Sequence, residues 1–264
     1  MDLKRRWNSI NIVNLMVTAL IILVLYNLYS LGINNAFSII IVVITVSLLD
    51  LAINYIKEKH LFIPRNAIIT GLILSLIIQA SLQLLIFIAI IAILSKHIIK
   101  IKGRHIFNPA NFTLFVALFL PVSESWWGVS NILLVAVLGL IIVYKLRRYH
   151  LVIPFLVVHG LLMLAVFTAS SSTGQIVGHF ASGSLLFFVF YMLIEPVTSP
   201  TARRSRIIFG MLAGLFAAIL YFVWLPAMLV GALFFADLCV PLLDWKLRPK
   251  PLTQPVQSLN KLVV

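Results

Sequence analysis

The sequence predicts an all-α polytopic membrane protein, a bundle of about ten transmembrane helices. Of its 264 residues, 62% are hydrophobic and only 10% are charged, whereas soluble domains average about 45–50% apolar and about 25% charged residues. Long stretches carry no charged side chain, and a spanning helix needs about 20 apolar residues. Composition therefore excludes a soluble globular protein, and the single Cys excludes a disulfide framework.

Six stretches without Asp, Glu, Lys or Arg set the helix count. Four of them are 30 to 46 residues long, enough for two helices each, and the two of 19 and 20 residues hold one each. Polar breaks within the longer stretches place the helix ends. The ten predicted helices are 10–31, 36–56, 67–79, 83–100, 110–121, 131–144, 151–168, 180–194, 206–222 and 226–243.

Two of these helices, 67–79 and 110–121, are too short to cross about 30 Å of hydrocarbon at 1.5 Å per residue. We therefore expect half-helices that lie inside the bundle, where protein surrounds the backbone.

Ten helices also favour two inverted five-helix repeats, about 10–121 and 131–243, because an odd repeat inserts its second copy upside down. In this scheme residues 1–244 form a single transmembrane domain, and residues 245–264 form a cytoplasmic tail.

The basic residues predict the orientation. All 20 Lys and Arg residues fall at the termini or in alternate loops, and the other loops contain none. The positive-inside rule places the basic loops in the cytoplasm. We expect a multi-pass protein of the cell membrane with both termini cytoplasmic. Basic loops lying against anionic lipid headgroups also account for the net charge of +13 without any nucleic-acid partner.

Small residues open the third helix of each predicted repeat. Thr70 and Gly71 begin one on the inner side, and Ser182 and Gly183 begin the other on the outer side. Such starts let backbones approach closely and leave N–H groups for an anionic ligand. Ordinary close packing of helices is the alternative.

Two proline-broken segments on the inner side are candidates for binding. The first runs from Gly103 to Asn111, and the second from Glu195 to Thr201. Proline leaves backbone carbonyls without helical partners, and the side chains of Asn108, Thr198 and Ser199 can satisfy those groups or a ligand. The alternatives are a helix cap at Asn108 and a plain turn followed by an arginine cluster.

Several motifs in the same order give a more specific indication. They are Ile69-Thr70-Gly71-Leu72-Ile73-Leu74-Ser75-Leu76; Lys96 followed by Gly103 and Phe107-Asn108-Pro109-Ala110; His179 to Gly183; Glu195-Pro196-Val197-Thr198-Ser199-Pro200; Ile207 to Gly210; and Pro241 to Asp244. From about residue 60 to 250, the chain resembles the RnfD/NqrB family, the related membrane subunits of the Rnf electron-transport complex and of the sodium-translocating NADH:quinone reductase. Glu195 stands where that family usually has Asp.

The resemblance implies a membrane redox subunit that passes electrons through flavin, FMN or riboflavin, across or along the membrane, with ion coupling as a further implication. The implied partners are other subunits of a membrane complex and an FMN-carrying extracytoplasmic protein. Half-helix starts and the basic side chains of Arg203, Arg204 and Arg206 can hold a flavin phosphate or steady a reduced flavin. The candidate cofactor-binding residues are Thr70, Gly71, Lys96, Asn108, Pro109, Ser182, Gly183, Glu195, Thr198 and Ser199.

The sequence departs from this family at the flavin attachment site. The family carries FMN on a Thr within an S-G-A-T motif, in the outer loop between the fifth and sixth helices. Here that loop, 121–130, contains no Thr, and Ser172-Thr173-Gly174 lies in a different loop without the motif order. Covalent FMN is therefore not expected; either flavin is held non-covalently or a partner supplies the missing station.

Two acids and two histidines complete the candidates. Asp50 and Asp237 lie within predicted helices, where a charge is costly. Each is a possible ion or proton site, with a buried ion pair or a protonated carboxyl as the alternative. His159 and His179 are predicted at different membrane depths, which argues against haem. The sequence shows no phosphate loop and no metal-spaced Cys/His cluster.

Two other functional classes stay open. A solute or ion channel or transporter would suit the same inverted-repeat architecture, because fold does not fix function. A non-catalytic scaffold could dock redox partners through the basic face.

Overall fold

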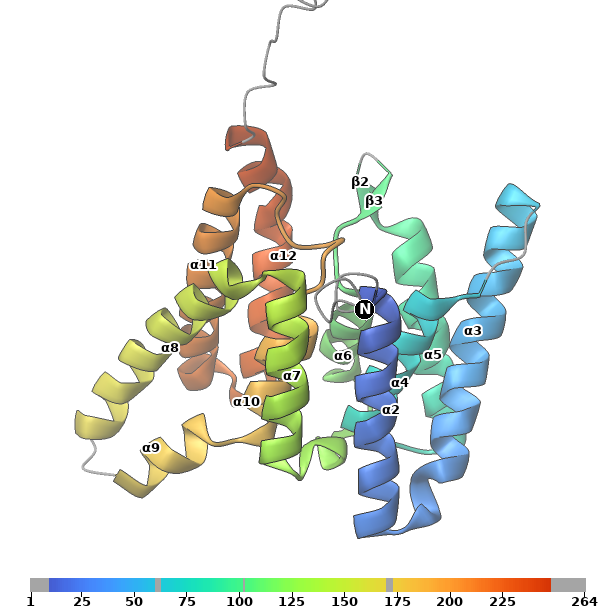
Figure 1. Ribbon diagram of the computed structural model, residues 1–264, viewed down its shortest axis with the longest axis horizontal. Helices are drawn as coiled ribbons and strands as arrows, with labels where there is room; N and C mark the ends of the chain where they lie inside the picture. The colour runs from blue at the N-terminus through green and yellow to red at the C-terminus, as the bar shows by residue number, and fades with distance from the viewer. Residues whose placement is uncertain (1–9, 60–62, 102, 170–172, 248–264) are drawn as a thin grey trace, which may run out of the picture.

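The computed structural model describes residues 10–59, 63–101, 103–169 and 173–247. These residues form an almost entirely helical bundle (Figure 1). Five helical segments are long and apolar enough to cross a membrane. They contain α2 (Ile12–Leu31), α3 (Ala36–Glu58, preceded by η1, Ile33–Asn35), α8 (Tyr149–Ala169), α11 (Arg203–Val223) and α12 (Met228–Lys246, preceded by η4, Leu225–Ala227). The predicted all-α polytopic membrane fold is confirmed.

The remaining helices are shorter. They are α4 (Arg65–Ile77), α5 (Leu82–Ile98), α6 (Pro109–Ala117), α7 (Ile132–Leu146), α9 (Thr173–Phe180) and α10 (Gly183–Phe187), which continues as the π-helix η3 (Phe188–Met192). The two half-helices expected from the sequence are α4 and α6, of 13 and 9 residues. One helix was not predicted: α9 occupies a stretch that the sequence predicts as an outer loop.

Polar side chains start several of these helices. An N-cap side chain accepts a hydrogen bond from one of the first N–H groups, which have no partner inside the helix. The cap at Asn108 is combined with a proline at the first helical position, where its missing N–H costs nothing. The observed caps are Asn11 on α2, Asn108 on α6, Asn131 on α7 and Ser182 on α10.

Corresponding helix pairs are in contact in the two halves of the chain. The first helix packs on the third (α2 on α4, α7 on α10), and the second on the fourth (α3 on α5, α8 on α11). The fourth also packs on the fifth (α5 on α6, α11 on α12). The division into two inverted repeats stays a prediction, and this pattern supports it.

The α8–α11 pair is packed through glycines. A Cβ atom on Gly210 would lie 2.3 Å from the carbonyl oxygen of Leu151, and one on Gly214 would lie 2.8 Å from that of Phe155. Small residues four apart allow two membrane helices to approach closely. This contact fixes α8 against α11 and, with it, the position of His159 on α8.

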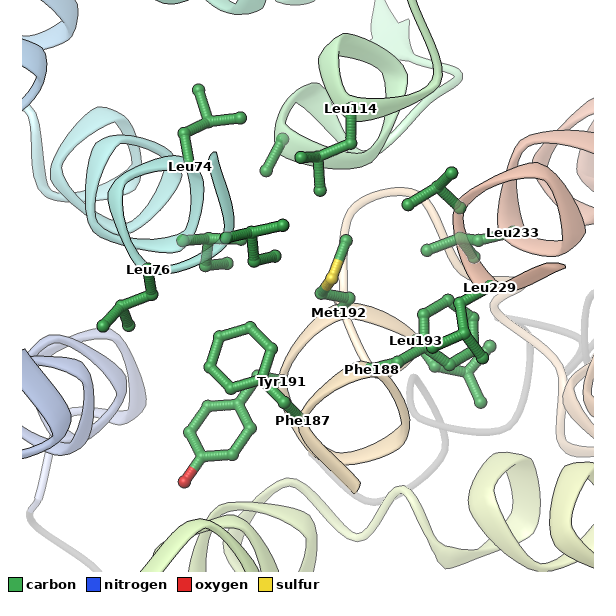
Figure 2. Packing of buried hydrophobic residues seen from close by; sticks show 14 of the residues in the cluster. Leu74, Leu76, Leu114, Phe187, Phe188, Tyr191, Met192, Leu193, Leu229 and Leu233 are labelled. Carbon is green, nitrogen blue, oxygen red and sulfur yellow. The ribbon is translucent and has the colours of Figure 1, made fainter. Parts of the chain in front are cut away.

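Apolar side chains fill the centre of the bundle (Figure 2). Leucines of α4, α6 and α12 surround the aromatic and apolar side chains of α10 and η3. The labelled members are Leu74, Leu76, Leu114, Phe187, Phe188, Tyr191, Met192, Leu193, Leu229 and Leu233.

Two short antiparallel ladders lie at opposite ends of the bundle. β1 (Ile78–Gln79) pairs with β4 (Ser123–Glu124), and β2 (Lys100–Ile101) pairs with β3 (Arg104–His105). The 3-10 helix η2 (Trp127–Val129) follows β4. The β2–β3 hairpin and the basic ends of α3 and α12 lie at the top of Figure 1, whereas α9 and the α2–α3 turn lie at the bottom.

We call the end with the basic residues the inner end and the opposite end the outer end. Residues 1–9 and most of the predicted tail, 248–264, lie outside the described residues. The cytoplasmic placement of the termini therefore stays a prediction.

Candidate functional site

A cavity of about 280 Å³ opens toward the inner end, between α2, α4, α6, α7 and the segment that follows η3. We call it the inner cavity. Its lining is mainly apolar, and three of its polar residues were predicted from separate motifs. These are Thr70 on α4, Asn108 at the start of α6, and Glu195 after η3. The structure thus brings together three candidates that lie far apart in the sequence.

Asn108 joins three elements beside this cavity. Its backbone N–H donates to Asp237 Oδ2 on α12 (3.1 Å), and its Nδ2 donates to the carbonyl oxygen of Met192 (3.2 Å). Its Oδ1 accepts from the N–H of Asn111, as predicted for a helix cap (3.2 Å). Pro109, the next residue, is buried as the first residue of α6. Asn108 therefore has a structural role that any ligand-binding role must share.

Glu195 separates the inner cavity from a second one. Its Oε2 accepts from the hydroxyl of Thr198 (3.2 Å), and its Oε1 lies 3.6 Å from Nε2 of His105. His105 and Thr198 line a neighbouring cavity of about 240 Å³, together with Arg104 and Asp244. Glu195 thus lines the inner cavity and contacts two residues that line the neighbouring one.

Arginines hold the broken segment that follows Glu195. Residues 197–201, which we call the arginine-bound segment, expose carbonyl groups that no helix satisfies. Arg104 donates to the carbonyls of Val197 and Ser199, and Arg206 donates to those of Pro200 and Thr201. Sequence reasoning assigned this task to hydroxyl and amide side chains, whereas the structure gives most of it to guanidinium groups.

Two further groups complete this arrangement. Arg148 Nη1 donates to the hydroxyl of Ser199 (3.0 Å), and Ser199 and Thr198 are both buried. Burial, aided by the charges of Arg206 and Arg104, lowers the pKa of Arg148 to about 10. Asp244 accepts from the N–H and the hydroxyl of Thr201 (3.0 and 3.1 Å) and lies 3.5 Å from Arg104.

The two predicted ion or proton sites differ. Asp50 on α3 is buried and pairs with Nζ of Lys96 (2.9 Å) and Nε2 of His97 (2.8 Å) on α5, which is the ion-pair alternative. Lys96 is therefore bound to Asp50 and does not line the inner cavity. Asp237 is fully buried on α12, and its Oδ1 has no hydrogen-bond partner among the described residues.

Three other predicted site residues are packing or capping positions. A Cβ atom on Gly71 would lie 2.7 Å from Cγ2 of Val46, and one on Gly183 would lie 2.1 Å from the carbonyl oxygen of Val129. The hydroxyl of Ser182 accepts from the N–H of Leu185 (3.3 Å). These contacts support the alternative of ordinary close packing, both in α4 and at the start of α10.

One sequence argument is wrong. His159 and His179 were placed at different membrane depths, but their Nε2 atoms lie 2.9 Å apart. The error follows from the missed helix α9, which returns His179 toward α8. Nothing in the spacing of the two histidines signals this contact.

The outer end holds the loop 121–130. The N–H groups of Ser125 and Trp126 donate to the carbonyl oxygen of Ile77, at the end of α4 (2.9 and 3.1 Å). Beside this loop lies an outer cavity of about 430 Å³, whose lining includes Glu124 and Trp126. Burial raises the pKa of Glu124 to about 8.

Comparison with known proteins agrees with the resemblance seen in the motifs. Residues 111–253 match the family described as "NQR2, RnfD, RnfE family". The chain is 30% identical over 141 residues to the RnfD subunit of the ion-translocating oxidoreductase complex of Haemophilus influenzae (strain PittEE), covering 52% of this chain and 38% of that protein. The protein of the same name from Escherichia coli (strain K12 / DH10B) is 35% identical over 116 residues, 40% of this chain and 31% of the relative.

A third protein of that name, from Actinobacillus pleuropneumoniae serotype 5b (strain L20), is 29% identical over 132 residues, covering 48% of this chain and 37% of the relative. The alignments thus span less than two fifths of the length of these curated relatives. The family match itself covers more than half of the chain. The chain therefore belongs to the NQR2, RnfD, RnfE family.

Proposed function

We propose that this chain is a membrane subunit of a multi-subunit redox complex, and that its inner cavity holds a flavin non-covalently while electrons pass across or along the membrane. The observation that carries the proposal is the convergence of Thr70, Asn108 and Glu195 on one cavity. The relatives are named as subunits of an ion-translocating oxidoreductase complex, which supports the redox class.

The lining of the inner cavity fits a flat, mainly apolar ring with one polar edge. Isoleucines supply apolar walls, among them Ile73 of α4 and Ile142 of α7. The hydroxyl of Thr70 donates to the carbonyl oxygen of Asn66 (3.1 Å), so its oxygen can still accept a hydrogen bond. The volume lies just below the range of about 300–1,000 Å³ usual for ligand pockets, which suits a ring system with its side chain outside.

The residues around the cavity would have separate tasks. The apolar walls exclude water, and the carboxylate of Glu195 can accept a hydrogen bond from a ring N–H. The imidazole of His105 lies 3.6 Å from that carboxylate and belongs to the lining of the neighbouring cavity. A bound flavin supplies one- and two-electron transfer chemistry.

The proposal includes the setting of the protein. We propose a multi-pass protein of the cell membrane with cytoplasmic termini, bound to other subunits of the complex and to an extracytoplasmic FMN-carrying protein. Asp237 is the proposed ion or proton site, because one of its oxygens is buried without a partner among the described residues, whereas Asp50 is already paired with Lys96. Attachment of FMN through a Thr is no part of the proposal.

The test is a visible spectrum of the detergent-purified protein before and after acid precipitation. We expect absorbance near 450 nm, on the order of one flavin per chain, that moves to the supernatant as non-covalent flavin does. Met16→Trp, which places a large side chain in the cavity lining, should remove the colour. Leu25→Trp on the same helix is the matched control, because Leu25 is 60% exposed and lies outside the lining.

Three results would count against the proposal. Colour that stays with the precipitate would indicate covalent attachment. Equal flavin content in both Trp variants would move the site elsewhere. A colourless, folded protein, purified gently enough to retain partners, would leave the transporter and scaffold hypotheses, and solute flux into liposomes would then distinguish those two.

A further inference from the structure

Two histidines from different helices meet near the outer end, away from the inner cavity. His159 on α8 is fully buried, and its Nε2 lies 2.9 Å from Nε2 of the half-buried His179 on α9. Figure 1 shows α9 beside the outer end of α8. Two imidazole nitrogens this close can share one proton or, with a small movement, one metal ion, because imidazole is a common metal ligand.

A methionine lies in the same cluster. Met163 follows His159 by four residues on α8, so both side chains project from one face of the helix. Met163 is fully buried and belongs to a small apolar cluster that includes Phe180 and Tyr221. The ring of His179 contacts both of those aromatic rings. Met163 thus shares a helix face with His159 and two aromatic neighbours with His179, and we call these three side chains the His–Met cluster.

The surroundings select the charge of the ion. The described side chains around the His–Met cluster are apolar or aromatic, and none is an acid. They are Phe155, Val166, Phe167, Ile176, Phe180, Ala218 and Tyr221. A divalent ion without a carboxylate would be costly in such a setting. Zn²⁺ also prefers four ligands, whereas the described residues hold no group of three or more His, Cys, Asp or Glu that could bind a metal.

We propose that His159, His179 and Met163 form a binding site for a monovalent soft metal ion, Cu(I). Thioether sulfur selects Cu(I), and imidazole binds copper well. Metal–imidazole bonds are about 2 Å long, so the two rings separate slightly from their present 2.9 Å when the ion is bound. The site needs no flavin and is independent of the proposed redox function.

The experiment titrates the full chain, purified in detergent and kept anaerobic with ascorbate, against Cu(I) held by the coloured chelator bicinchoninate. We expect one Cu(I) per chain. Ag(I), which has the same charge and does not change oxidation state under these conditions, should compete for the same site. X-ray absorption of the copper-loaded wild-type protein should show two nitrogen ligands and one sulfur ligand.

Variants assign the ligands. Met163→Leu keeps the buried volume and should weaken Cu(I) binding about tenfold, and His179→Phe should weaken it about a hundredfold, at the upper end of the range seen when a metal site loses supporting groups. Met211→Leu, a 45% exposed methionine on α11, and His150→Phe, on α8 itself, are the controls and should bind as the wild type does.

Several outcomes would overturn the proposal. Absence of stoichiometric binding to folded wild-type protein would show that the histidines only form a hydrogen bond joining α9 to α8. A spectrum without sulfur would remove Met163. Equal losses in the site variants and the controls would place the copper elsewhere. The wild-type spectrum decides the question even if His179→Phe fails to fold.

Discussion

The inner and outer ends of this bundle hold irregular backbone in different ways. At the inner end, the arginine-bound segment 197–201 is fixed by charged groups, namely Arg104, Arg206 and Asp244. At the outer end, the loop 121–130 is fixed by neutral groups. Non-helical backbone that is buried must find partners within the protein, and the two ends find them in different residue types.

Asn27 is the clearest case of irregular backbone held by a neutral side chain. This fully buried amide on α2 donates to the carbonyl oxygens of Leu23 (2.7 Å) and Gly128 (2.8 Å), and it accepts from the hydroxyl of Ser130 (2.7 Å). The indole of Trp127 donates to the carbonyl oxygen of Ser75 (2.8 Å), which closes the end of half-helix α4.

The difference follows from where the charges lie. The outer loops contain no Lys or Arg, so cations are available only at the inner end. Acids follow the same division. Asp244 at the inner end faces Arg104, whereas Glu124 at the outer end has an Oε1 without a hydrogen-bond partner among the described residues. Desolvation of a carboxyl group without a charged partner favours its protonated form.

Replacing Glu124 tests this division and carries the largest expected effect. Below about pH 4.5 the carboxyl is protonated in both the folded and the unfolded chain. Between 4.5 and about 8 only the folded chain keeps the proton, so the free energy of unfolding falls as pH rises. Relative to Glu124→Gln, the wild type should lose up to about 1.4 kcal/mol per pH unit at the steepest point, and roughly 4–5 kcal/mol over the whole range from pH 4.5 to about 8.

The measurement is the unfolding midpoint in detergent at several pH values from 4 to 9, for the wild type and Glu124→Gln. Ser123→Ala, in the same loop, should follow the wild-type profile. Parallel curves for the wild type and Glu124→Gln would show that the carboxyl is not held neutral, and the two ends would then handle acids alike.

Asn27→Leu should give the next largest effect. The change leaves the carbonyl of Gly128 and the hydroxyl of Ser130 without this partner, and an unsatisfied buried polar group costs about 1–3 kcal/mol. We expect a loss of about 2–4 kcal/mol in the free energy of unfolding, independent of salt. Asn14→Leu, at an exposed position of the same helix, is the control. A loss no larger than that of the control would contradict the proposed role.

Charge distribution and length predicted most of the fold. Charge-free stretches located the helices that are seen, and the shortness of 67–79 and 110–121 predicted α4 and α6 as half-helices. Three candidate site residues from separate motifs converge on the inner cavity. The helix predictions succeeded because apolar length and helix starts are local properties that the sequence shows directly, whereas the binding role of the three residues stays a prediction.

The missed features depend on tertiary contacts. The stretch 173–180 has apolar residues at helical spacing, Ile176 and Phe180, but it is only eight residues long. Because so short a segment is predicted as a loop, the contact with His159 could not be found. Likewise, Arg104 meets the carbonyl of Ser199 across 95 residues of sequence. A positive-inside cluster looks the same in sequence whether its guanidinium groups face lipid or hold backbone.

Arg104→Leu tests whether charged side chains hold the irregular backbone at the inner end. The change removes the donor to two carbonyls and the partner of Asp244, but the Arg104 side chain is 42% exposed and its charge is screened by water. We expect a loss of about 1–2 kcal/mol in the free energy of unfolding at low salt, and a smaller loss at about 1 M salt. If the loss did not change with salt concentration, Arg104→Leu and Asn27→Leu would show no difference in salt dependence, and the contrast between the two ends would be lost.

Thr201→Val should give the smallest effect, about 0.5 kcal/mol, because the contact is exposed and Asp244 keeps two other partners. The hydroxyl bond to Asp244 (3.1 Å) is lost, while the N–H of Thr201 and Arg104 remain. Arg104 and Thr201 share the partner Asp244, so each can partly replace the other. The losses in the free energy of unfolding caused by their two substitutions should therefore not simply add. In a thermal unfolding series, Arg104→Leu combined with Thr201→Val should cost more than the two single losses together. Strict additivity would show that Asp244 does not link these two contacts.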